Sequence, residues 1–417
     1  MIVRQFVLAF LLFTVTNAAL AEPKVATWPQ WRGPTRDGVV PSSPAWPATL
    51  TESNFQKIWR VEDLGPSYSG VVVAEDRIFI TETVEKKDEF VRALDRKTGR
   101  ELWKTSWAGA LTVPFFAAEN GGWIRSTPAY DGESLYVAGI RDVLVCLDAK
   151  TGMERWKVDF VKEYATPVPA FGFVCSPLVD DKAVYVQAGA AFFKLDKKTG
   201  KVVWKSLQDA GGMNGSAFSS PVFAKILGKD QLLVQGRDSL SGVDPANGDV
   251  LWSRKIPTFR GMNILTPIQY GEDKLLTSTY GGKTMSMYLK SEEGKFSVGD
   301  SWTQKHEGYM STPVIVDGHA YIHLKSRRIM CLDLADGKEC WMTEKAYGRY
   351  WSLVTQKDKI LALDERGVLM LIRATPEKFD VIGEIKLPFR ETWAHIAIAG
   401  DEVFIRDLQG VTAYRWR

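Results

Sequence analysis

Short runs of alternating apolar and polar residues recur along the chain from Trp59 onward, with Gly, Asp and Pro residues between them. The clearest unit has such runs at residues 126–130, 134–138, 143–148 and 154–156. Runs of this length, bounded by turn residues, predict β-strands that follow one another as a meander. No window keeps a helical period, so we predict an all-β fold.

The third run of each unit ends in a recurring signature, Leu-Asp-x-x-Thr-Gly-x-x-x-Trp. Its aspartate occurs at Asp95, Asp148 and Asp196, with variant copies around Asp244 and Asp333. A period of roughly 50 residues indicates a repeat architecture. The aspartate can accept backbone N–H groups across the turn, the glycine supplies a positive φ, and the tryptophan can pack against the next unit. We therefore assign the signature to the fold and not to chemistry.

Counting the units by their first strand gives eight. The last unit, which begins near Trp393, has only three runs and finishes with residues 411–414. Residues 57–60, which include Trp59, look like the missing fourth strand and precede the first unit. Pairing them with the last run would close a ring, which leaves no long sheet edge exposed. We predict an eight-bladed β-propeller of four-stranded antiparallel blades over residues 59–417, closed by the strand around Trp59.

The residues before the propeller do not follow the strand pattern. Residues 1–21 contain a positive Arg4, an apolar stretch and an Ala-Leu-Ala end, which together predict a cleaved signal peptide. No later apolar run is long enough for a transmembrane helix. We expect an exported protein, periplasmic or extracellular. Residues 22–58 are rich in Pro, Trp and Ser, and we predict an extended N-terminal arm that packs as a strap on the outside of the propeller.

Charge and cysteine content narrow the picture further. The net charge of +3 is nearly balanced and no basic cluster occurs, so we expect no nucleic-acid partner. We also expect the protein to be a monomer. Four cysteines are too few for a disulfide framework in a chain of this size. If Asp333 pairs with Lys338 around its turn, Cys331 and Cys340 lie directly opposite each other, and this register permits a cross-strand disulfide. The alternative is a set of buried free thiols.

The repeated signature, preceded by a Ser-x-Pro first strand, resembles the PQQ-like β-propeller repeat family (pyrrolo-quinoline quinone repeats). The resemblance covers nearly all of residues 59–417, and residues 28–38 resemble the N-terminus of secreted bacterial members. It implies the propeller fold. It leaves function open, because the family includes quinoprotein dehydrogenases, outer-membrane assembly propellers that bind proteins, and members without a known role.

The segments just before each first strand are predicted to ring one mouth of the central channel. Aromatic rings alternate there with arginines, which suits a small planar anionic ligand, since rings stack and guanidinium groups bind carboxylates. The alternative is a rim shaped for packing or for a protein partner. The predicted mouth residues are Tyr68, Trp123, Arg125, Phe171, Phe173, Asn214, Phe218, Arg260, Asn263, His306, Glu307, Tyr309, Arg349, Tyr350, Trp351, Trp393 and His395.

A dehydrogenase of this family would hold PQQ with calcium through clustered oxygen ligands and would use an acidic base. Around the predicted mouth the acidic residues are only Glu307 and Glu391, and no adjacent cysteine pair occurs. We assign no catalytic residue, no metal ligand and no required cofactor. The leading hypothesis is a secreted, non-catalytic module that binds a ligand or an envelope protein at its channel mouth. The alternatives are a PQQ-dependent quinoprotein dehydrogenase of alcohols or sugars and a cell-envelope assembly scaffold.

Overall fold

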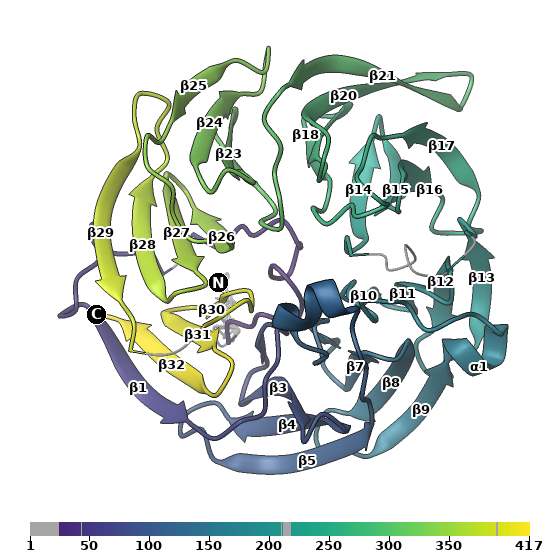
Figure 1. The fold of residues 1–417 in the computed structure, drawn as a ribbon, viewed down its shortest axis with the longest axis vertical. Coiled ribbons are helices and arrows are strands. Elements are labelled where there is room, and N and C mark those ends of the chain that lie inside the picture. The colour runs from purple at the N-terminus through teal and green to yellow at the C-terminus, as the bar shows by residue number, and fades with distance from the viewer. Residues whose placement is uncertain (1–24, 43, 210, 212–217, 389–390) are drawn as a thin grey trace, which may run out of the picture.

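The strands of the protein form eight four-stranded antiparallel sheets arranged as blades around a central axis (Figure 1). The computed structural model describes residues 25–42, 44–209, 211, 218–388 and 391–417. Helix within this part of the chain is limited to a 3₁₀ turn, η1 (Phe115–Asn120), and the short helix α1 (Phe160–Tyr164). The predicted all-β, eight-bladed propeller is confirmed. The predicted signal peptide, residues 1–21, and the mouth residue Asn214 lie outside the described residues.

The first four blades follow one another from the inner strand to the outer strand. Blade 1 has β2 (Val72–Val73), β3 (Arg77–Val84), β4 (Asp88–Asp95) and β5 (Glu101–Ala108). Blade 2 has β6 (Ala129–Tyr130), β7 (Ser134–Gly139), β8 (Val143–Asp148) and β9 (Glu154–Asp159). Blade 3 has β10 (Leu178–Val179), β11 (Ala183–Ala188), β12 (Ala191–Asp196) and β13 (Val202–Ser206). Blade 4 has β14 (Val222–Ile226), β15 (Lys229–Gln235), β16 (Ser239–Val243) and β17 (Val250–Lys255).

The remaining blades repeat this order until the last one. Blade 5 has β18 (Ile268–Tyr270), β19 (Lys274–Ser278), β20 (Thr284–Glu292) and β21 (Lys295–Gln304). Blade 6 has β22 (Val314–Val316), β23 (His319–His323), β24 (Ile329–Asp333) and β25 (Glu339–Met342). Blade 7 has β26 (Trp351–Gln356), β27 (Lys359–Asp364), β28 (Val368–Arg373) and β29 (Asp380–Lys386). Blade 8 has β30 (Ala397–Ala399), β31 (Glu402–Arg406), β32 (Val411–Trp416) and β1 (Phe55–Val61).

The two ends of the propeller meet in blade 8. Strand β1 pairs antiparallel with β32, from Phe55 opposite Trp416 to Val61 opposite Val411 (Figure 1). The predicted closure by the strand around Trp59 is therefore confirmed. The strand begins at Phe55, so residues 55–58, which the sequence pattern placed in the arm, belong to the ring. None of the described helices is long and apolar enough to cross a membrane.

The signature residues tie each blade to its neighbour. Asp95 Oδ1 accepts hydrogen bonds from the Thr98 backbone N–H at 2.8 Å and from the Thr98 hydroxyl at 2.7 Å. Gly99 has φ 74°, and a Cβ there would lie 2.8 Å from the Trp59 ring of the preceding outer strand. The Trp59 indole N–H donates to the Arg96 carbonyl at 3.0 Å. The glycine is thus required twice, for its φ and because the tryptophan of the previous blade packs on it.

The hydrophobic core lies mainly between neighbouring blades. One buried cluster joins Phe79 and Val91 of blade 1 to Leu135 and Val145 of blade 2. Another joins residues of blades 2 and 3 around Phe160, which α1 contributes. Each blade therefore buries its apolar face against the next one, as expected when repeats share one continuous core.

The register around the cysteines differs from the prediction. Asp333 does pair with Lys338 through a 2.9 Å backbone hydrogen bond. A β-bulge between Cys331 and Leu332 then shifts the ladder, so that Cys331 lies opposite Trp341 and not opposite Cys340. The prediction that the two cysteines are directly opposed was wrong, because a bulge adds one residue to one strand. All four cysteines are free thiols in the structure, with Cys331 buried and Cys340 exposed.

Thiol reactivity should reflect this arrangement. We expect Ellman's reagent to modify Cys340 quickly in the native protein and the other three thiols only after unfolding. Burial raises the pKa of both Cys146 and Cys175 to about 12, which leaves very little reactive thiolate. Titration in denaturant without reductant should therefore find four thiols. A total of two, restored to four by reductant, together with no fast reaction of Cys340 in the native protein, would show that Cys331 and Cys340 form a disulfide after all.

Candidate functional site

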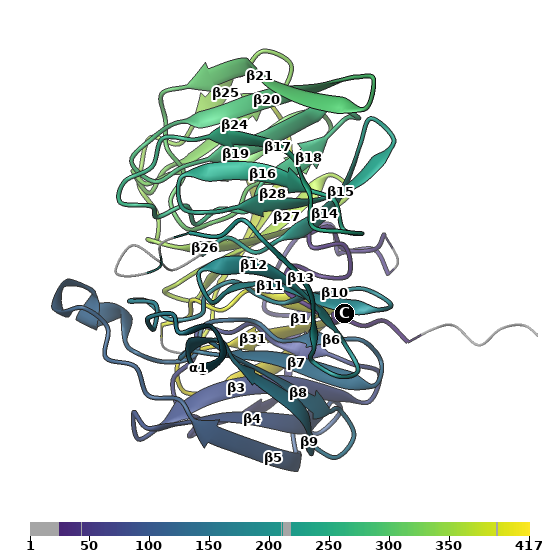
Figure 2. The same ribbon diagram turned by 90° about the vertical axis from the view of Figure 1, so that its right-hand side faces the viewer.

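The N-terminal arm enters the base of the central channel. It was predicted to pack on the outside of the propeller, and that prediction was wrong for residues 28–36. Trp28 is 1% exposed, and the backbone of Trp28 pairs with Val73 of blade 1. Figure 2 shows the arm, in purple, on the side of the disc opposite to the loop that carries η1. The arm therefore closes one end of the channel and leaves the predicted mouth at the other end.

Two buried arginines hold the arm in place. The Arg32 guanidinium donates to the carbonyls of Thr312 at 3.1 Å and Pro313 at 2.9 Å, both in blade 6. Arg36 donates to the carbonyls of Pro177 at 2.6 Å and Ser176 at 3.0 Å, in blade 3. These carbonyls belong to the residues just before β22 and β10, so each guanidinium binds two consecutive carbonyls of one blade. The Arg32 and Arg36 guanidinium groups lie 5.6 and 5.5 Å from the centroid of the Trp31 ring, which lines the channel cavity.

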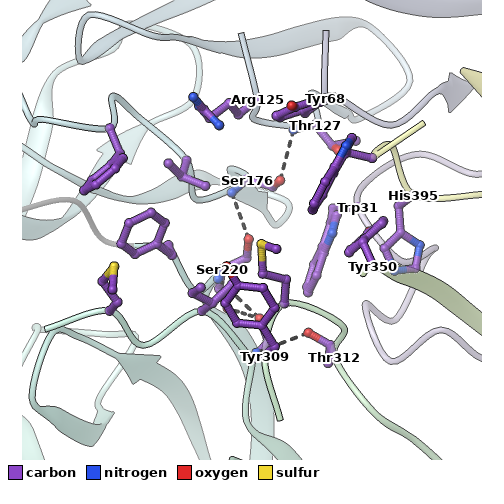
Figure 3. A pocket seen from close by; sticks show the side chains of 18 residues that line it. Trp31, Tyr68, Arg125, Thr127, Ser176, Ser220, Tyr309, Thr312, Tyr350 and His395 are labelled. Atoms are coloured by element: carbon purple, nitrogen blue, oxygen red, sulfur yellow. Dashed lines mark hydrogen bonds between the residues drawn. The ribbon is translucent and has the colours of Figure 1, made fainter. Parts of the chain in front are cut away.

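A belt of hydroxyl groups lines the channel above the arm, one each from blades 2 to 6: Thr127, Ser176, Ser220, Thr266 and Thr312. Each hydroxyl accepts a hydrogen bond from a backbone N–H of the preceding blade. In Figure 3, dashed lines mark the links from the Thr127 N–H to Ser176 Oγ at 3.1 Å and from the Ser176 N–H to Ser220 Oγ at 2.9 Å. Ser220 and Thr266 repeat the link with the next blade at 3.3 Å. In blades 2 to 6, the Ser or Thr that directly precedes the proline of the first strand thus joins one blade to the next. In the sequence, these first strands served only to count the blades.

Above the belt lies a cavity of about 220 Å³, which we call the cup. Its base includes Trp31, and its walls come from the segments that precede the inner strands (Figure 3). Eight of the seventeen mouth residues predicted from the sequence line it, and two of these eight are Phe171 and Phe218. The other six are Tyr68, Arg125, Tyr309, Tyr350, Trp393 and His395. The sequence reading missed Trp31, the belt hydroxyls, Val174, Met262, Ile264 and Met310.

Two of the predicted mouth residues stand directly behind the cup. The Trp123 ring packs edge-on against Tyr68, with ring centroids 5.5 Å apart. The Arg349 guanidinium lies over the Trp393 ring at 5.5 Å from its centroid. They support the walls and do not line the cavity.

Four other predicted residues do not reach the cup. Trp351 is the first residue of β26, is 1% exposed, and stacks on His323 in the core between blades 6 and 7. Phe173 is 2% exposed and packs edge-on against Phe160. Asn263 donates to the backbone carbonyls of residues 236 and 237. Arg260 is exposed. From the wider rim, Glu307 binds Lys325 at 2.8 Å and His306 faces Glu339 at 3.6 Å.

The charge of the cup comes from buried arginines. Burial lowers the pKa of Arg125 and of Arg32 to about 10, and that of Arg36 to about 9. All three guanidinium groups therefore stay protonated at neutral pH. Burial also holds the pKa of His395 well below its ordinary value, so this imidazole is neutral. Among the described residues, no aspartate or glutamate lines the cup. The electrostatic potential inside it is consequently positive.

The donor groups of the cup do not fit a calcium–quinone site. Calcium takes six to eight oxygen ligands, usually with carboxylates among them. The oxygen atoms around the cup are belt hydroxyls that already accept backbone hydrogen bonds, and tyrosine hydroxyls. The described part of the chain contains no cluster of three His, Cys, Asp or Glu residues that could hold a metal ion. Glu391, the nearest acid of the rim, binds Arg349 at 3.1 Å.

The loop that carries η1 reaches over one side of the cup. Phe116 of η1 packs edge-on against Phe171, with ring centroids 6.3 Å apart. Phe115, beside it, is 91% exposed, and Phe116 is 57% exposed. Two large aromatic side chains therefore face solvent next to the mouth.

Comparisons with known proteins agree with the fold and with the repeat. Residues 87–343, more than half of the chain, match the PQQ_2 family model described as outer membrane protein assembly factor BamB. The chain is 23% identical over 343 residues to BamB of Moranella endobia, covering 77% of this chain and 73% of that protein.

Two solved structures have the same fold. BamB from Moraxella catarrhalis has a TM-score of 0.62 at 14% identity, covering 87% of this chain and 98% of its own. A quinohemoprotein alcohol dehydrogenase from Comamonas testosteroni has a TM-score of 0.66 at 12% identity, covering 94% of this chain and 80% of its own. At these identities the structural likeness shows the fold alone. The family model decides the assignment, and the chain belongs to the PQQ-like β-propeller family that is described as outer membrane protein assembly factor BamB.

Proposed function

We propose that the protein is a non-catalytic, exported and monomeric binding module, and that its cup holds a small flat anion. One observation carries the proposal: an aromatic cup with a buried arginine in its wall and no carboxylate among the described residues that line it. The ring of the ligand would lie among Trp31, Tyr309 and Trp393, and its acidic group would face Arg125. The predicted signal peptide is the reason to place the module outside the cytoplasm.

The physical argument rests on desolvation. Removing a guanidinium from water costs free energy, and burial lowers the pKa of Arg125 for this reason. A bound carboxylate would recover part of that cost through charge-assisted hydrogen bonds, which contribute about 1.5–3 kcal/mol each. Aromatic contacts add about 0.5–1.5 kcal/mol beyond the area that they bury. A neutral ligand of the same shape would gain only the aromatic part.

The test is a binding series read by the fluorescence of the cup tryptophans. We expect naphthoate and related aromatic carboxylates to bind more tightly than their amides, and Arg125→Met to weaken the carboxylates by about 10- to 100-fold, which corresponds to one charge-assisted hydrogen bond. Arg373→Met is a matched control, because Arg373 faces Asp380 on the outside of blade 7 and is 55% exposed. Equal affinity for acid and amide would contradict the proposal. Dye reduction that needs added PQQ and calcium would instead favour the dehydrogenase.

A second candidate function is an envelope assembly scaffold. The family description favours it, since it names an outer membrane protein assembly factor. The exposed Phe115 and Phe116 are the surface that would meet a protein partner. The Phe115→Ser/Phe116→Ser double variant should then lose envelope proteins that the wild type captures from an extract, while its affinity for aromatic carboxylates stays within twofold. Unchanged capture would exclude this surface as the contact.

A further inference from the structure

The innermost strand of a blade has one edge that its own blade leaves unpaired, and the arm binds this edge. In blade 1, the Val73 N–H donates to the Trp28 carbonyl at 2.9 Å, and the Trp28 N–H donates back at 2.8 Å. In blade 7, the Thr355 N–H donates to the Gly38 carbonyl at 2.8 Å, and the Thr355 carbonyl accepts from Val40 at 2.7 Å. An extended segment is thus added to the sheet at both places, once antiparallel and once parallel.

The strand register shows which residues of an inner strand have their backbone N–H and carbonyl on the unpaired edge. In an antiparallel pair, residues alternate between bonding their partner strand and pointing away from it. In blade 3, the Asp180 N–H donates to the Ala183 carbonyl, so the backbone groups of the preceding residue, Val179, point away from β11. Val73 has the same position in blade 1, next to the bonded pair of Ala74 and Arg77, and there both backbone groups bind the arm. Val179 therefore offers the same N–H and carbonyl.

Blade 4 has two such residues. Ile226 and Lys229 flank the two-residue turn, and counting back from them, Lys225 and Phe223 point away from β15. The amide side chain of Gln269 meets the backbone of Lys225, accepting from its N–H at 3.0 Å and donating to its carbonyl at 2.6 Å. A side-chain amide thus takes the place that a peptide backbone takes on Val73. Phe223 lies two residues earlier on the same edge.

The edges of Val179 and Phe223 border a groove of about 450 Å³ beside the arm. Arm residues 34–37 form its other wall. Within the described residues, the backbone hydrogen bonds of the arm go to blades 1, 2, 7 and 8, so the arm passes blades 3 and 4 without pairing. Phe223 is 42% exposed. The groove and the cup share only Thr266 and Thr312, and Trp31 lines the cup but not the groove.

We propose that this groove binds an extended peptide segment of a partner protein, which adds as a strand to the edges of Val179 and Phe223. The groove continues the interface that the arm already occupies, because residues of the arm form one wall of it. The groove would recognise a backbone N–H and carbonyl pair of the partner peptide, together with an apolar side chain of the peptide that packs on Phe223. This site does not depend on the ligand of the cup.

The probe is a synthetic peptide with the sequence of residues 25–31, the stretch of the arm that pairs with Val73. In the native full-length protein its own edge is occupied, so we expect the peptide to bind at blades 3 and 4. The amide signals of Val179 and Phe223 should shift in a nuclear magnetic resonance titration. In the free protein, the Val179 N–H should exchange with solvent at least tenfold faster than the ladder-bonded N–H of Leu178.

Two matched variants separate backbone pairing from folding. Val179→Pro removes the outward N–H and no ladder hydrogen bond, a position where proline is tolerated. It should weaken the peptide at least tenfold and keep the thermal midpoint near that of the wild type, whereas Val179→Ala should change the affinity less than threefold. A scrambled peptide of equal affinity, binding that Val179→Pro leaves unchanged, or a Val179 N–H as protected as that of Leu178 would each overturn the proposal.

Discussion

The Trp351→Ala variant is expected to lose about 3–5 kcal/mol of unfolding free energy, the usual cost of removing a buried aromatic side chain. Trp351 is 1% exposed, stacks on His323 with ring centroids 5.7 Å apart, and packs edge-on against Tyr347. The cavity left behind would lie between blades 6 and 7, and neighbouring side chains could fill it only if both sheets moved. Urea unfolding followed by circular dichroism measures the change.

A matched control is Trp393→Ala, which removes a tryptophan of the same size from the wall of the cup. Trp393 is partly exposed and stacks on Tyr350, with ring centroids 5.4 Å apart. We expect a smaller loss of stability than for Trp351→Ala and a clear loss of affinity for aromatic carboxylates. Similar losses of stability in both variants would mean that Trp351 is not the core residue described here.

Replacing Glu89 with glutamine is expected to change the stability of the protein in a strongly pH-dependent way. Glu89 is 0% exposed and accepts from the Trp107 indole at 2.7 Å and from the Ile140 N–H at 2.8 Å. Burial nevertheless raises the pKa of its carboxyl from 4.5 to about 7. At pH 8 the folded protein must hold this buried carboxylate charged, and the attraction of Lys157 offsets little of the burial, so the charge costs about 3 kcal/mol.

The sign of the pH dependence follows from the raised pKa. Stability linked to Glu89 is fully present below its unfolded pKa, near 4.5, and is lost as pH rises through about 7. The stability of Glu89→Gln relative to the wild type should therefore fall by about 2 kcal/mol between pH 8 and pH 5.5. The comparison must be between the two proteins at each pH. Buried His323 and His395, whose pKa values are lowered, change the stability of both proteins in the opposite direction.

Paired urea titrations at pH 5.5, 7 and 8 measure the difference. Any steric cost of the glutamine amide is the same at each pH and cancels from the trend. Asp142→Asn offers an independent repetition, because burial raises the pKa of Asp142 to about 7 as well. A difference that stays constant over this range would mean that Glu89 titrates like an exposed carboxyl.

The fold could be predicted because its signals are local and repeated. The hydrogen bonds of the turn around Asp95 involve only residues within four positions of it. The contact between Gly99 and Trp59 joins consecutive units of the repeat. The bulge after Cys331 was missed although it recurs. The same bulge lies between Ala93 and Leu94 in blade 1 and between Cys146 and Leu147 in blade 2, but the residue pattern does not mark the extra residue, and so the register was wrong by one.

The cup was only partly predictable, because only part of it is built from repeated segments. The mouth loops can be counted from the repeat, which is why Tyr68, Tyr309 and Trp393 were found. Adjacent residues of a strand point in opposite directions, and the sequence does not say that β26 begins at Trp351, so Tyr350 was placed correctly and Trp351 was not. Trp31 follows no period, and the Arg32 side chain that helps to fix it binds a carbonyl 280 residues away.

The arm continues directly into β1, so the folding of the arm is coupled to the closure of the ring. β1 can complete the ring only when it meets β32, more than 350 residues further along the chain. Closing so long a loop costs about 5 kcal/mol of chain entropy before the seam forms. Arg32 also needs blade 6 in place before it can bind Pro313. Seven blades can therefore assemble early, and the cup acquires its base in the same late event that joins the two ends of the ring.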